Sequence, residues 1–582
     1  MNKTLENERF TAAKAEADKV EERILDALRR GRSFRVEAGA GSGKTYSLNR
    51  VVEWVQANKR EEFQRKKQNA VCVTYTNAAV EVIRERLPND SFIEPSTIHA
   101  FAWKAIKRYQ SALIDQIQKD ESLWSKGAER VEISKVDYAL GSRYTENGVH
   151  YLYHNDVLDL FCRLLDRPKF RRVFADKYPL ILIDEYQDSY KPLVDRFIEY
   201  FIAQDRGPQF GFFGDAWQTI YRSNDACGLI ECEKLEVIQK NANFRSAPKI
   251  VDVLNRLRPE LPQRSAVDGF EGEVYVVTCD DFKGERRADR GFQGDLPEDA
   301  LKERINLLNE RLETATPPDE TLKTLMITHK VLAAQQGYAW LLEILGNDWR
   351  NDDDAFLVFF MNVVEPIYAA LTEENTRGLF DALGVRRYPI TRKSEKTQWK
   401  TLRQNLEEAR ERKTLDVLNV VAESKLVPIP PKVEEHLRRF RVEPDAIYVA
   451  KTSATLRDLF DLEYRQFCNA INFLRPESAF STEHGVKGEE YDNVIFVISK
   501  GWNQYQFETY APMITGAVAV PKGKEESFER NRNLFYVSCS RAKKRLILFV
   551  SLLLDAKFRA FLTDLVGEKR VLTFGEFLAL NG

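Results

Sequence analysis

The amino-acid sequence predicts an α/β protein built on parallel sheets, and three observations support this fold class. Short apolar runs with the composition of strands recur along the chain, and helical patterns separate most of them. The chain of 582 residues is too long for a single hydrophobic core, so several domains are expected. Its 43% hydrophobic and 30% charged residues are typical of a globular protein. Strands that alternate with helices favour parallel sheets covered by helices.

The strand-like runs occur in both halves of the chain. They are residues 33–37, 71–75, 180–183, 210–213, 324–328, 494–498 and 546–550. Two long segments between them have a mainly helical pattern, and the simplest layout is two α/β domains that each carry a mainly helical insertion. The charged segment 280–320, with Pro317 and Pro318 near its end, is interpreted as a surface connection.

Charge and cysteine usage narrow the class of protein. The formal net charge is -2 and the pI about 6.4, so any surface for nucleic acid must be a local groove balanced by acidic faces elsewhere. The seven cysteines are scattered without a paired C-x-x-C motif, which indicates reduced thiols and no zinc or iron–sulfur centre. No apolar run reaches the length of a membrane span, and the first residues lack the apolar core of a signal peptide. We expect a cytoplasmic protein.

A glycine-rich run predicts a phosphate-binding loop. Residues 38–45 read Ala38, Gly39, Ala40, Gly41, Ser42, Gly43, Lys44 and Thr45, directly after a predicted strand. Small residues let backbone N–H groups close around phosphates, while Lys44 offers a positive charge to the β- and γ-phosphates. The Thr45 hydroxyl is a candidate ligand for Mg²⁺. The alternative is an ordinary glycine-rich turn that precedes a helix.

Two adjacent carboxylates end another strand. The run 180–189 reads LILIDEYQDS, which places Asp184 and Glu185 at the carboxyl edge of a parallel sheet, where α/β enzymes bind their ligands. Asp184 is a candidate to hold Mg²⁺, and Glu185 to orient and deprotonate the attacking water. A solvated acidic pair is the alternative, which the preceding phosphate loop makes a poor explanation.

The loop AGAGSGKT followed by DEYQDS resembles the UvrD/Rep/PcrA branch of superfamily 1 DNA helicases. Six further segments match motifs of that branch in the same order. They are 74–77 (TYTN), 96–101 (STIHAF), 214–221 (GDAWQTIY), 243–246 (NFRS), 481–491 (STEHGVKGEEY) and 533–542 (NLFYVSCSRA). The resemblance implies ATP and Mg²⁺ as cofactors, bound between two RecA-like domains.

The resemblance also suggests domain boundaries. The first RecA-like domain is expected at 1–104 and 166–232 around a helical insertion at 105–165. The second is expected at 233–339 and 446–582 around a reduced helical insertion at 340–445.

Several residues outside the loop acquire roles from the resemblance. It implies that Gln218 senses the γ-phosphate and that Glu490 contacts the ribose. Arg245 and Arg541 are implied at the γ-phosphate, where two positive charges suit a transition state with charge spread over several oxygens. For either arginine, a surface salt bridge is the alternative.

The adenine site is less defined. Phe244 lies where the family stacks the base, and Tyr46 follows the phosphate loop, so these two flat rings are predicted to hold the adenine. Both rings could instead be core aromatics. The family also reads the adenine edge with a glutamine upstream of the loop, and residues 1–55 contain no glutamine, which leaves the nucleotide selectivity open.

The remaining motif residues are implied to line a groove for single-stranded DNA. They are Thr76, Thr97, His99, Phe101, Trp217, Tyr221, Thr482 and His484. Hydroxyl groups bind phosphates and aromatic rings stack on bases without reading the sequence, as a motor requires. For single residues other interpretations remain, since Phe101 could be a core residue and His99 a satisfied polar one.

Two biological roles fit this family. One is a DNA helicase or translocase that moves 3′ to 5′ in repair or replication. The reduced insertion and the NFRS motif also resemble helicase subunits of Gabija-like anti-phage systems, in which the helicase-like chain works beside a separate nuclease chain. The chain is expected to carry no fused nuclease, so such a nuclease is a possible partner. A catalytically dead scaffold is disfavoured because Lys44, Asp184 and Glu185 are all present.

Overall fold

The protein is described here by a computed structural model. It describes residues 2–74, 77–124, 130–138, 143–219, 226–326, 332–333, 336–346, 354–383, 393–449, 452–475, 480–482, 489–500 and 505–580. The chain forms two compact units. Unit 1 comprises Met1–Phe282, Val486–Phe496 and Gln504–Asn581, and unit 2 comprises Lys283–Gly485, Val497–Asn503 and Gly582.

Unit 1 contains a six-stranded sheet with the order β3-β2-β7-β8-β1-β9. Its strands are β1 (Phe34–Ala38), β2 (Ala70–Thr74), β3 (Ile93–Thr97), β7 (Leu180–Asp184), β8 (Gln209–Gly214) and β9 (Glu236–Lys240). Every neighbouring pair is parallel, which confirms the predicted class of sheet. The edge strands β3 and β9 were not predicted, because they contain too many polar residues to stand out as apolar runs.

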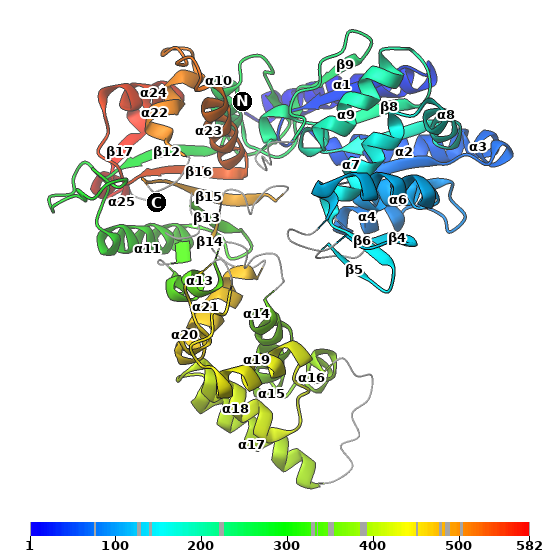
Figure 1. Ribbon diagram of the computed structural model, residues 1–582. Coiled ribbons are helices and arrows are strands. Elements are labelled where there is room, and N and C mark those ends of the chain that lie inside the picture. The colour runs from blue at the N-terminus through cyan, green and yellow to red at the C-terminus, as the bar shows by residue number, and fades with distance from the viewer. Residues whose placement is uncertain are drawn as a thin grey trace. The chain divides into compact units, whose positions relative to one another are not determined.

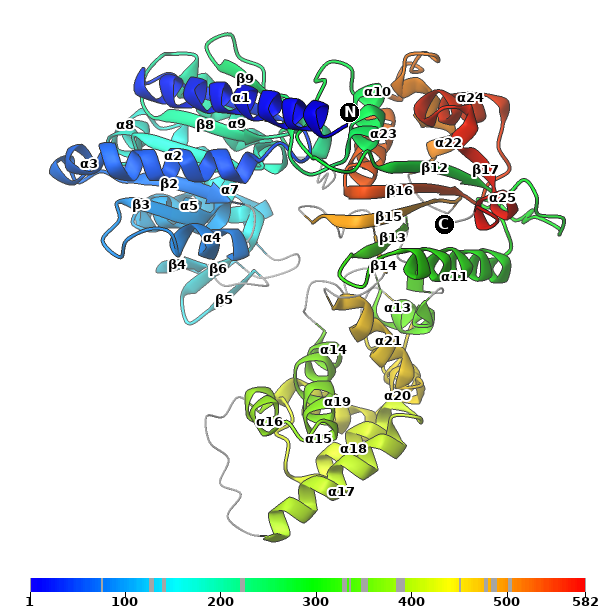
Figure 2. The ribbon, with the colours of Figure 1, turned by 180° about the vertical axis from the view of Figure 1, so that it is seen from behind.

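Each face of this sheet has its own hydrophobic core. Side chains alternate along β2, so Val71 and Val73 join one core while Cys72 joins the other. One core is closed by α1 (Asn2–Arg29) and α2 (Lys44–Asn58), which lie in front of the sheet in Figure 2. The helices that contribute to the other core include α5 (Ile98–Ile106), α6 (Gln110–Lys119), α7 (His154–Leu165), α8 (Pro168–Lys177) and α9 (Lys191–Phe197). The helices α3 (Arg60–Lys66) and α4 (Asn77–Arg84) complete this layer structure.

The segment predicted as a helical insertion at 105–165 also contains a small sheet. After α6 (Gln110–Lys119), three strands pair in the order β4-β6-β5: β4 (Lys135–Tyr138), β5 (Tyr144–Glu146) and β6 (Val149–Leu152). Each has three or four residues and includes charged or polar side chains, so no apolar run marked them in the sequence. The interpretation of this segment as mostly helical is corrected accordingly.

Unit 1 contains a second group of strands, with the order β15-β16-β12-β17. Their bounds are β12 (Glu273–Thr278), β15 (Tyr491–Ile498), β16 (Ala542–Val550) and β17 (Val571–Thr573). β12 is parallel to both β16 and β17. The helices of this part are α10 (Pro248–Leu257), α22 (Phe507–Ile514), α23 (Glu525–Cys539), α24 (Ala556–Val566) and α25 (Phe574–Leu578). A short parallel pair, β10 (Ala242–Asn243) and β11 (Arg264–Ser265), precedes them.

Unit 2 is mainly helical, with one short parallel strand pair formed by β13 (Leu322–Met326) and β14 (Phe480–Thr482). Its helices are α11 (Glu298–Ala315), α13 (Ala339–Leu345), α14 (Ala355–Phe359), α15 (Glu365–Thr372), α16 (Thr376–Ala382), α17 (Lys393–Ala409), α18 (Thr414–Ser424), α19 (Pro431–Val442), α20 (Leu456–Asp461) and α21 (Arg465–Leu474). Figure 1 shows α14 to α19 gathered in one bundle.

The interpretation of 280–320 as a surface connection was wrong. α11 occupies 18 of these residues and buries Leu301, Ile305, Leu308 and Leu312 on one face. The apolar residues of this face recur at intervals of three or four, and the many charges between them obscured the helical pattern.

One described stretch of unit 2, Ala355–Thr372, has the length and composition of a membrane span. Its Phe360 packs against Tyr464 and Phe467, with ring centroids 5.0 and 4.8 Å apart. Its Glu365 accepts hydrogen bonds from Arg410 at 3.0 and 2.7 Å. These contacts are those of a core helix of the bundle.

A buried ion pair joins the N-terminal helix α1 to the end of β9, and a hydrogen bond joins it to α2. Glu21 of α1 accepts hydrogen bonds from Lys240 Nζ at 2.7 Å and from Ser47 Oγ at 2.5 Å. Burial lowers the pKa of Lys240, and the Glu21 carboxylate opposes that shift. Because both charges are buried away from water, each depends on the other for its electrostatic stabilisation.

We therefore expect Glu21→Gln to lower the free energy of unfolding of unit 1 by about 3–5 kcal/mol, because the substitution leaves the buried Lys240 charge without a carboxylate partner. Chemical denaturation followed by circular dichroism measures the change. The matched control is Glu22→Gln, whose exposed pair with Arg29 spans 3.5 Å and should contribute about 0–1 kcal/mol. Equal effects of the two substitutions would contradict the role of the buried pair.

Candidate nucleotide site

The phosphate loop lies between β1 and α2, as predicted. Ala38 ends the strand, and Lys44 opens the helix after Gly43, whose φ is 77°. Backbone N–H groups at a helix N-terminus form a binding site for anions such as phosphate. Gly41 has a φ of 71°, and a Cβ at this position would lie 2.7 Å from Cβ of Arg245, so both its backbone conformation and its surroundings require glycine.

Residues distant in sequence hold the loop backbone from outside. Asn243 and Gln263 each donate a side-chain hydrogen bond to the carbonyl oxygen of Ala40 at 3.0 Å. The N–H of Ala40 donates to the Tyr536 hydroxyl at 3.3 Å. Sequence reasoning gave none of these three residues a role. Asn243 and Tyr536 lie within recognised motifs, and their place there could have indicated a role at the site. Gln263 lies outside all of the motifs.

The predicted acidic pair follows β7. Asp184 ends the strand, and its Oδ1 accepts a hydrogen bond from the N–H of Glu185 at 3.0 Å. Glu185 has a φ of 48°, a left-handed conformation that is uncommon for a residue other than glycine and that often marks functional sites. Gln187 donates its side-chain amide to the Glu185 carboxylate. Since β1 and β7 run parallel within one sheet, their carboxyl ends reach the same edge.

The donors at this edge suit Mg²⁺ that is shared with a nucleotide. The described residues contain no group of three or more His, Cys, Asp or Glu side chains arranged around a metal. Mg²⁺ in phosphoryl-transfer sites binds through one or two protein oxygens, with phosphate and water oxygens as its other ligands. The Thr45 hydroxyl and the Asp184 carboxylate are donors of that kind, and they remain the predicted metal ligands.

The two predicted arginines lie in different surroundings. Arg245 donates to Glu490 at 2.7 Å and to the carbonyl oxygen of Ser540 at 3.2 Å, so the alternative of a salt bridge describes its present contact. Arg541 is 1% exposed, and it donates to the carbonyl oxygens of Val537 and Glu489 at 3.1 and 3.0 Å. The surface salt bridge considered for Arg541 is therefore wrong.

Burial and the charge of Arg245 lower the pKa of Arg541 to about 9, while Glu185 opposes the shift. An anion beside these two guanidinium groups would relieve their mutual repulsion. Glu490 also pairs with Lys543 at 2.9 Å. Burial favours its neutral form, but Lys543 and Arg245 outweigh that effect and lower the pKa of Glu490.

The two aromatic rings predicted at the adenine are both accessible. Tyr46 is 58% exposed and Phe244 is 43% exposed, so the alternative that they are core aromatics is wrong. The N–H of Phe244 donates to the carbonyl oxygen of Gly41 at 2.9 Å, which places this residue beside the phosphate loop. Their stacking on a base stays a prediction.

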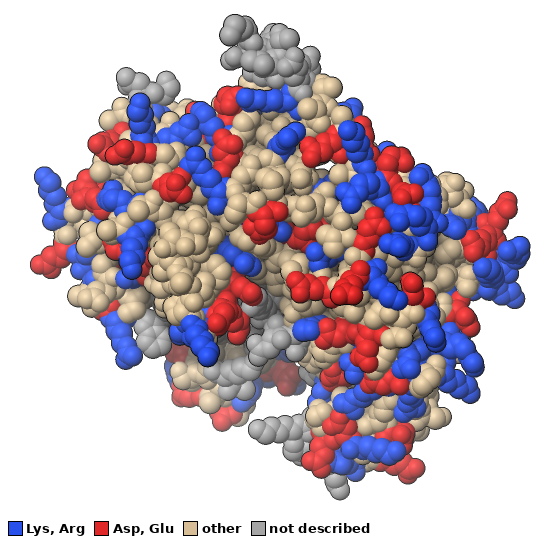
Figure 3. Space-filling view, turned by 90° about the horizontal axis from the view of Figure 1, so that it is seen from above, with Lys and Arg blue, Asp and Glu red and all other residues tan. Residues whose placement is uncertain are grey.

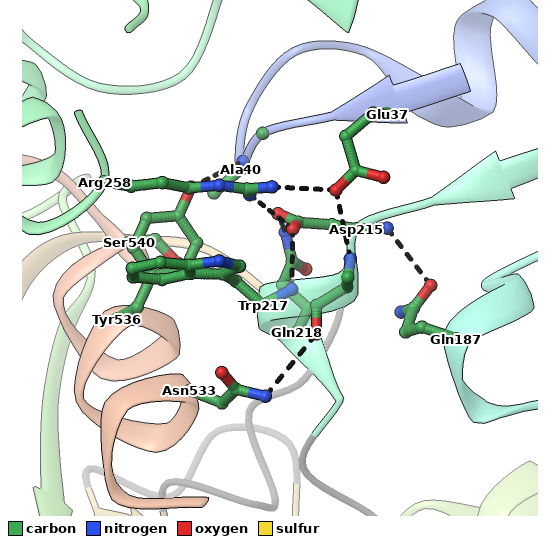
Figure 4. Close-up of polar contacts among 12 residues, drawn as sticks. Glu37, Ala40, Gln187, Asp215, Trp217, Gln218, Arg258, Asn533, Tyr536 and Ser540 are labelled. Atoms are coloured by element: carbon green, nitrogen blue, oxygen red, sulfur yellow. Dashed lines mark hydrogen bonds and ion pairs between the residues drawn. The ribbon is translucent and has the colours of Figure 1, made fainter. Parts of the chain in front are cut away.

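Gln218 belongs to a buried polar network, shown in Figure 4. Its side-chain amide donates to Asp215 at 2.7 Å, and the other oxygen of Asp215 accepts from Arg258 at 2.5 Å. Arg258 also donates to Glu37 of β1 at 2.7 Å. Burial opposes the charge of Arg258, but Asp215, Tyr536 and Glu37 outweigh it and raise the pKa of Arg258. No sequence pattern indicated a role for Arg258, which lies outside the recognised motifs.

Trp217, a predicted DNA contact, lies beside the same network. The guanidinium of Arg532 lies 4.1 Å from its ring centroid, and the ring of Tyr536 is 5.5 Å away in an edge-on arrangement. Trp217, Thr219 and Arg532 line a cavity of about 530 Å³. An aromatic ring and a guanidinium at a cavity suit a nucleobase and its phosphate.

His99 opens onto the acidic edge of the sheet. It lines a cavity of about 220 Å³ together with Asp184 and Glu185. Its Nε2 has no hydrogen-bond partner among the described residues, so the interpretation of His99 as a satisfied polar residue is wrong. Burial and the adjacent His154 lower the pKa of His99 to about 4, which keeps the ring neutral at physiological pH. Thr97 caps α5 by accepting a hydrogen bond from the N–H of Ala100 at 3.4 Å.

The prediction that Phe101 contacts DNA needs correction. Its ring is 1% exposed, and it packs 5.3 Å from the ring of Tyr178 and 6.0 Å from that of Phe161. Phe101 is therefore a core residue. Thr76, Tyr221 and His484 lie outside the described residues, as does the side chain of Thr482, whose backbone ends β14.

On the face of the molecule shown in Figure 3, basic and acidic side chains are interspersed. This mixture agrees with the near-neutral net charge. It also agrees with the expectation that any surface for nucleic acid is a local groove.

The fold and this site have the features of a P-loop ATPase, and they are similar to those of UvrD-like helicases. A family model described as an AAA domain matches residues 21–224, which include the phosphate loop, the acidic pair and Gln218. This match and the relatives below agree with the resemblance drawn from the sequence motifs, and together they support an ATP-dependent helicase.

Three relatives of known name are similar to this chain. The chain is 22% identical to the Gabija protein GajB of Bacillus cereus (strain HuB5-5), over 95% of this chain and 98% of that protein. It is 26% identical to GajB of Bacillus cereus (strain VD045), over 40% of this chain and 48% of that protein. It is also 25% identical to the putative ATP-dependent DNA helicase YjcD of Bacillus subtilis (strain 168), over 37% of this chain and 35% of that protein. The resemblance to the Gabija type thus extends over nearly the whole chain.

We expect Phe101→Ala to lower the free energy of unfolding by about 3–5 kcal/mol, because it leaves a cavity in a core of packed aromatic rings. At temperatures where the variant stays folded, its affinity for a single-stranded oligonucleotide should equal that of the parent. The matched control is Tyr46→Ala, which removes an exposed ring and should change stability by no more than about 0.5 kcal/mol. Chemical denaturation and fluorescence anisotropy measure the two effects. A loss of DNA affinity without a loss of stability would restore the DNA-contact interpretation of Phe101.

Proposed function

We propose that this chain is an ATP-driven motor that translocates 3′ to 5′ on single-stranded DNA and unwinds duplexes. The observation that carries the proposal is the convergence of residues on one phosphate loop. Lys44 and Thr45 belong to the loop itself, while Arg245 and Tyr536, which belong to later parts of unit 1, contact the loop or lie against it. In such an arrangement, the presence or loss of the γ-phosphate changes the contacts of both parts of the chain.

The proposed chemistry is hydrolysis of the γ-phosphate by an in-line water. Glu185 accepts a proton from the water as its oxygen attacks phosphorus, and the bond to the β,γ-bridging oxygen breaks to release ADP and phosphate. Lys44 balances negative charge on the phosphate oxygens. Thr45 and Asp184 would hold Mg²⁺, which supplies further neutralisation of that charge.

The pair of Arg245 with Glu490 would rearrange when ATP binds. In the present conformation the two side chains neutralise each other across 2.7 Å. Glu490 keeps a second cation, Lys543, at 2.9 Å, so it remains paired when Arg245 leaves. Arg245 could then turn to the γ-phosphate at little electrostatic cost, joining Arg541.

Two substitutions should separate binding from hydrolysis. Lys44→Ala is expected to remove ATP binding and turnover together, because the loop loses its charge on the phosphates. Glu185→Gln should keep nucleotide binding but lower kcat by roughly 10²–10⁴-fold, because the amide cannot accept the proton. Phosphate release and binding of a fluorescent ATP analogue measure the two quantities.

Lys59→Ala is the matched control for this pair. Lys59 lies just after α2 and pairs with Glu62 at 3.3 Å on the surface, so both quantities should keep their parental values. If Lys44→Ala hydrolysed ATP at the parental rate, the proposed phosphate site would be wrong.

A second candidate function is favoured by the similarity to GajB over 95% of the chain. In it, the ATPase senses DNA and controls a separate nuclease chain of an anti-phage system. The two candidates differ in what the isolated chain does with a tailed duplex and ATP. Strand separation by the chain alone supports the motor. DNA-dependent ATP hydrolysis without strand separation, together with stable association with a nuclease chain from the same source, supports the second candidate.

A further inference from the structure

We propose that Arg258 is a positioning residue that transmits DNA contact at Trp217 to the phosphate loop and to Gln218. The inference rests on the proposed function, because it concerns how DNA accelerates ATP hydrolysis at the same site. Its buried guanidinium donates to Glu37 and Asp215 and lies beside the rings of Trp217 and Tyr536.

Arg258 is placed to connect the two groups of strands in unit 1. It caps the C-terminus of α10, a helix that packs against α23 and β16. Its side chain extends from there to Glu37 of β1 and to Asp215, which follows β8. Arg258 is 4% exposed, and both carboxylates are buried with it.

Each carboxylate is connected to a different part of the nucleotide site. Glu37 directly precedes Ala38, the first residue of the predicted loop, and it also accepts a hydrogen bond from Tyr186 at 2.7 Å. Asp215 accepts from the Gln218 amide at 2.7 Å and from the N–H of Trp217 at 3.0 Å. A shift of Arg258 therefore acts on the start of the loop and on the predicted γ-phosphate sensor at once.

The aromatic neighbours of Arg258 provide the connection to DNA. Its guanidinium lies 5.3 Å from the ring centroid of Trp217 and 5.8 Å from that of Tyr536. Figure 4 draws both rings beside Arg258. The hydroxyl of Tyr536 holds the N–H of Ala40 in the phosphate loop. A base that stacks on Trp217 would change the packing of this ring. The Arg258 guanidinium beside the ring would then shift with it.

An arginine suits this role better than any other side chain. Its planar fork places two N–H groups on two carboxylates simultaneously and leaves a face for an aromatic ring. Because all three charges are buried, the guanidinium cannot leave one carboxylate without a large electrostatic penalty. The network therefore moves as one body.

Arg258→Gln tests the proposal in the full chain, with ATP and a single-stranded oligonucleotide of mixed sequence as probes. We expect kcat at saturating DNA to fall by roughly tenfold. The KM for ATP and the affinity for the oligonucleotide should change little, because Arg258 is buried and is not among the residues predicted to contact either ligand. Arg258→Lys should recover part of the DNA stimulation, because an ammonium group keeps the charge but lacks the fork that bridges both carboxylates.

The matched control is Arg256→Gln. Arg256 is on the same helix, and its guanidinium donates to the carbonyl oxygen of Asp564 on the surface, so this variant should behave like the parent. Thermal unfolding of each variant shows whether it is folded. If Arg258→Gln does not fold, Arg258→Met combined with Glu37→Gln takes its place with the same expected result, because it removes charges of both signs.

Three outcomes overturn the proposal. Parental stimulation by DNA in the folded Arg258 variant shows that the residue does not transmit the contact. An equal fall of kcat with and without DNA in both the Gln and Lys variants, or failure of the double variant to fold, shows a purely structural role. A parent protein whose ATP hydrolysis ignores DNA contradicts the proposed function itself, and this result is visible before any variant is made.

Discussion

The buried guanidinium of Arg258, held between Glu37 and Asp215, is the constraint on which the arrangement of the nucleotide site depends. A charge this deeply buried is stable only while both acids face it, so the strand before the phosphate loop, the turn that carries Gln218 and the end of α10 must keep one geometry. Arg35 also pairs with Glu37 at 3.5 Å, so the four buried side chains carry two charges of each sign, and removal of any one leaves an uncompensated charge in the interior. The network therefore fixes the relative positions of the residues at the nucleotide site, and it adds little to the stability of unit 1.

The phosphate loop depends on similar support. Its backbone is held at Ala40 by Asn243, Gln263 and Tyr536, and the space around Gly39 and Gly41 is filled by side chains from the same later segments. A site assembled from distant segments changes when those segments move. This property suits an enzyme in which hydrolysis accompanies a change in the arrangement of the chain. Upstream of the loop, where the family uses a glutamine to read adenine, this chain has no glutamine. Two exposed rings lie close to the loop in sequence or contact: Tyr46 directly follows the loop, and Phe244 directly follows Asn243, which donates a hydrogen bond to the loop.

Features that depend on a short stretch of sequence could be predicted from the sequence alone. Apolar runs located the central strands β1, β2, β7 and β8 to within a residue or two, because buried parallel strands are apolar on both faces. The spacing within residues 38–45 located the loop, and two carboxylates after an apolar run located Asp184 and Glu185. Features that depend on tertiary contacts were not accessible. Arg258 and Glu37 are 221 residues apart, and neither has a pattern that indicates the other. The same limit explains Gln263, and it explains Phe101, whose motif resembles a DNA contact although its ring is enclosed by Phe161 and Tyr178.

The proposed function requires that the nucleotide site and the DNA site share one free energy of coupling. Thermodynamic linkage then requires that a bound nucleotide change the affinity for DNA. The most direct measurement is the dissociation constant of a labelled single-stranded oligonucleotide, by fluorescence anisotropy, without nucleotide and with a saturating non-hydrolysable ATP analogue and Mg²⁺. The account predicts a change of roughly fivefold or more in the parent and none in Lys44→Ala. The same dissociation constant in both conditions for the parent would contradict it.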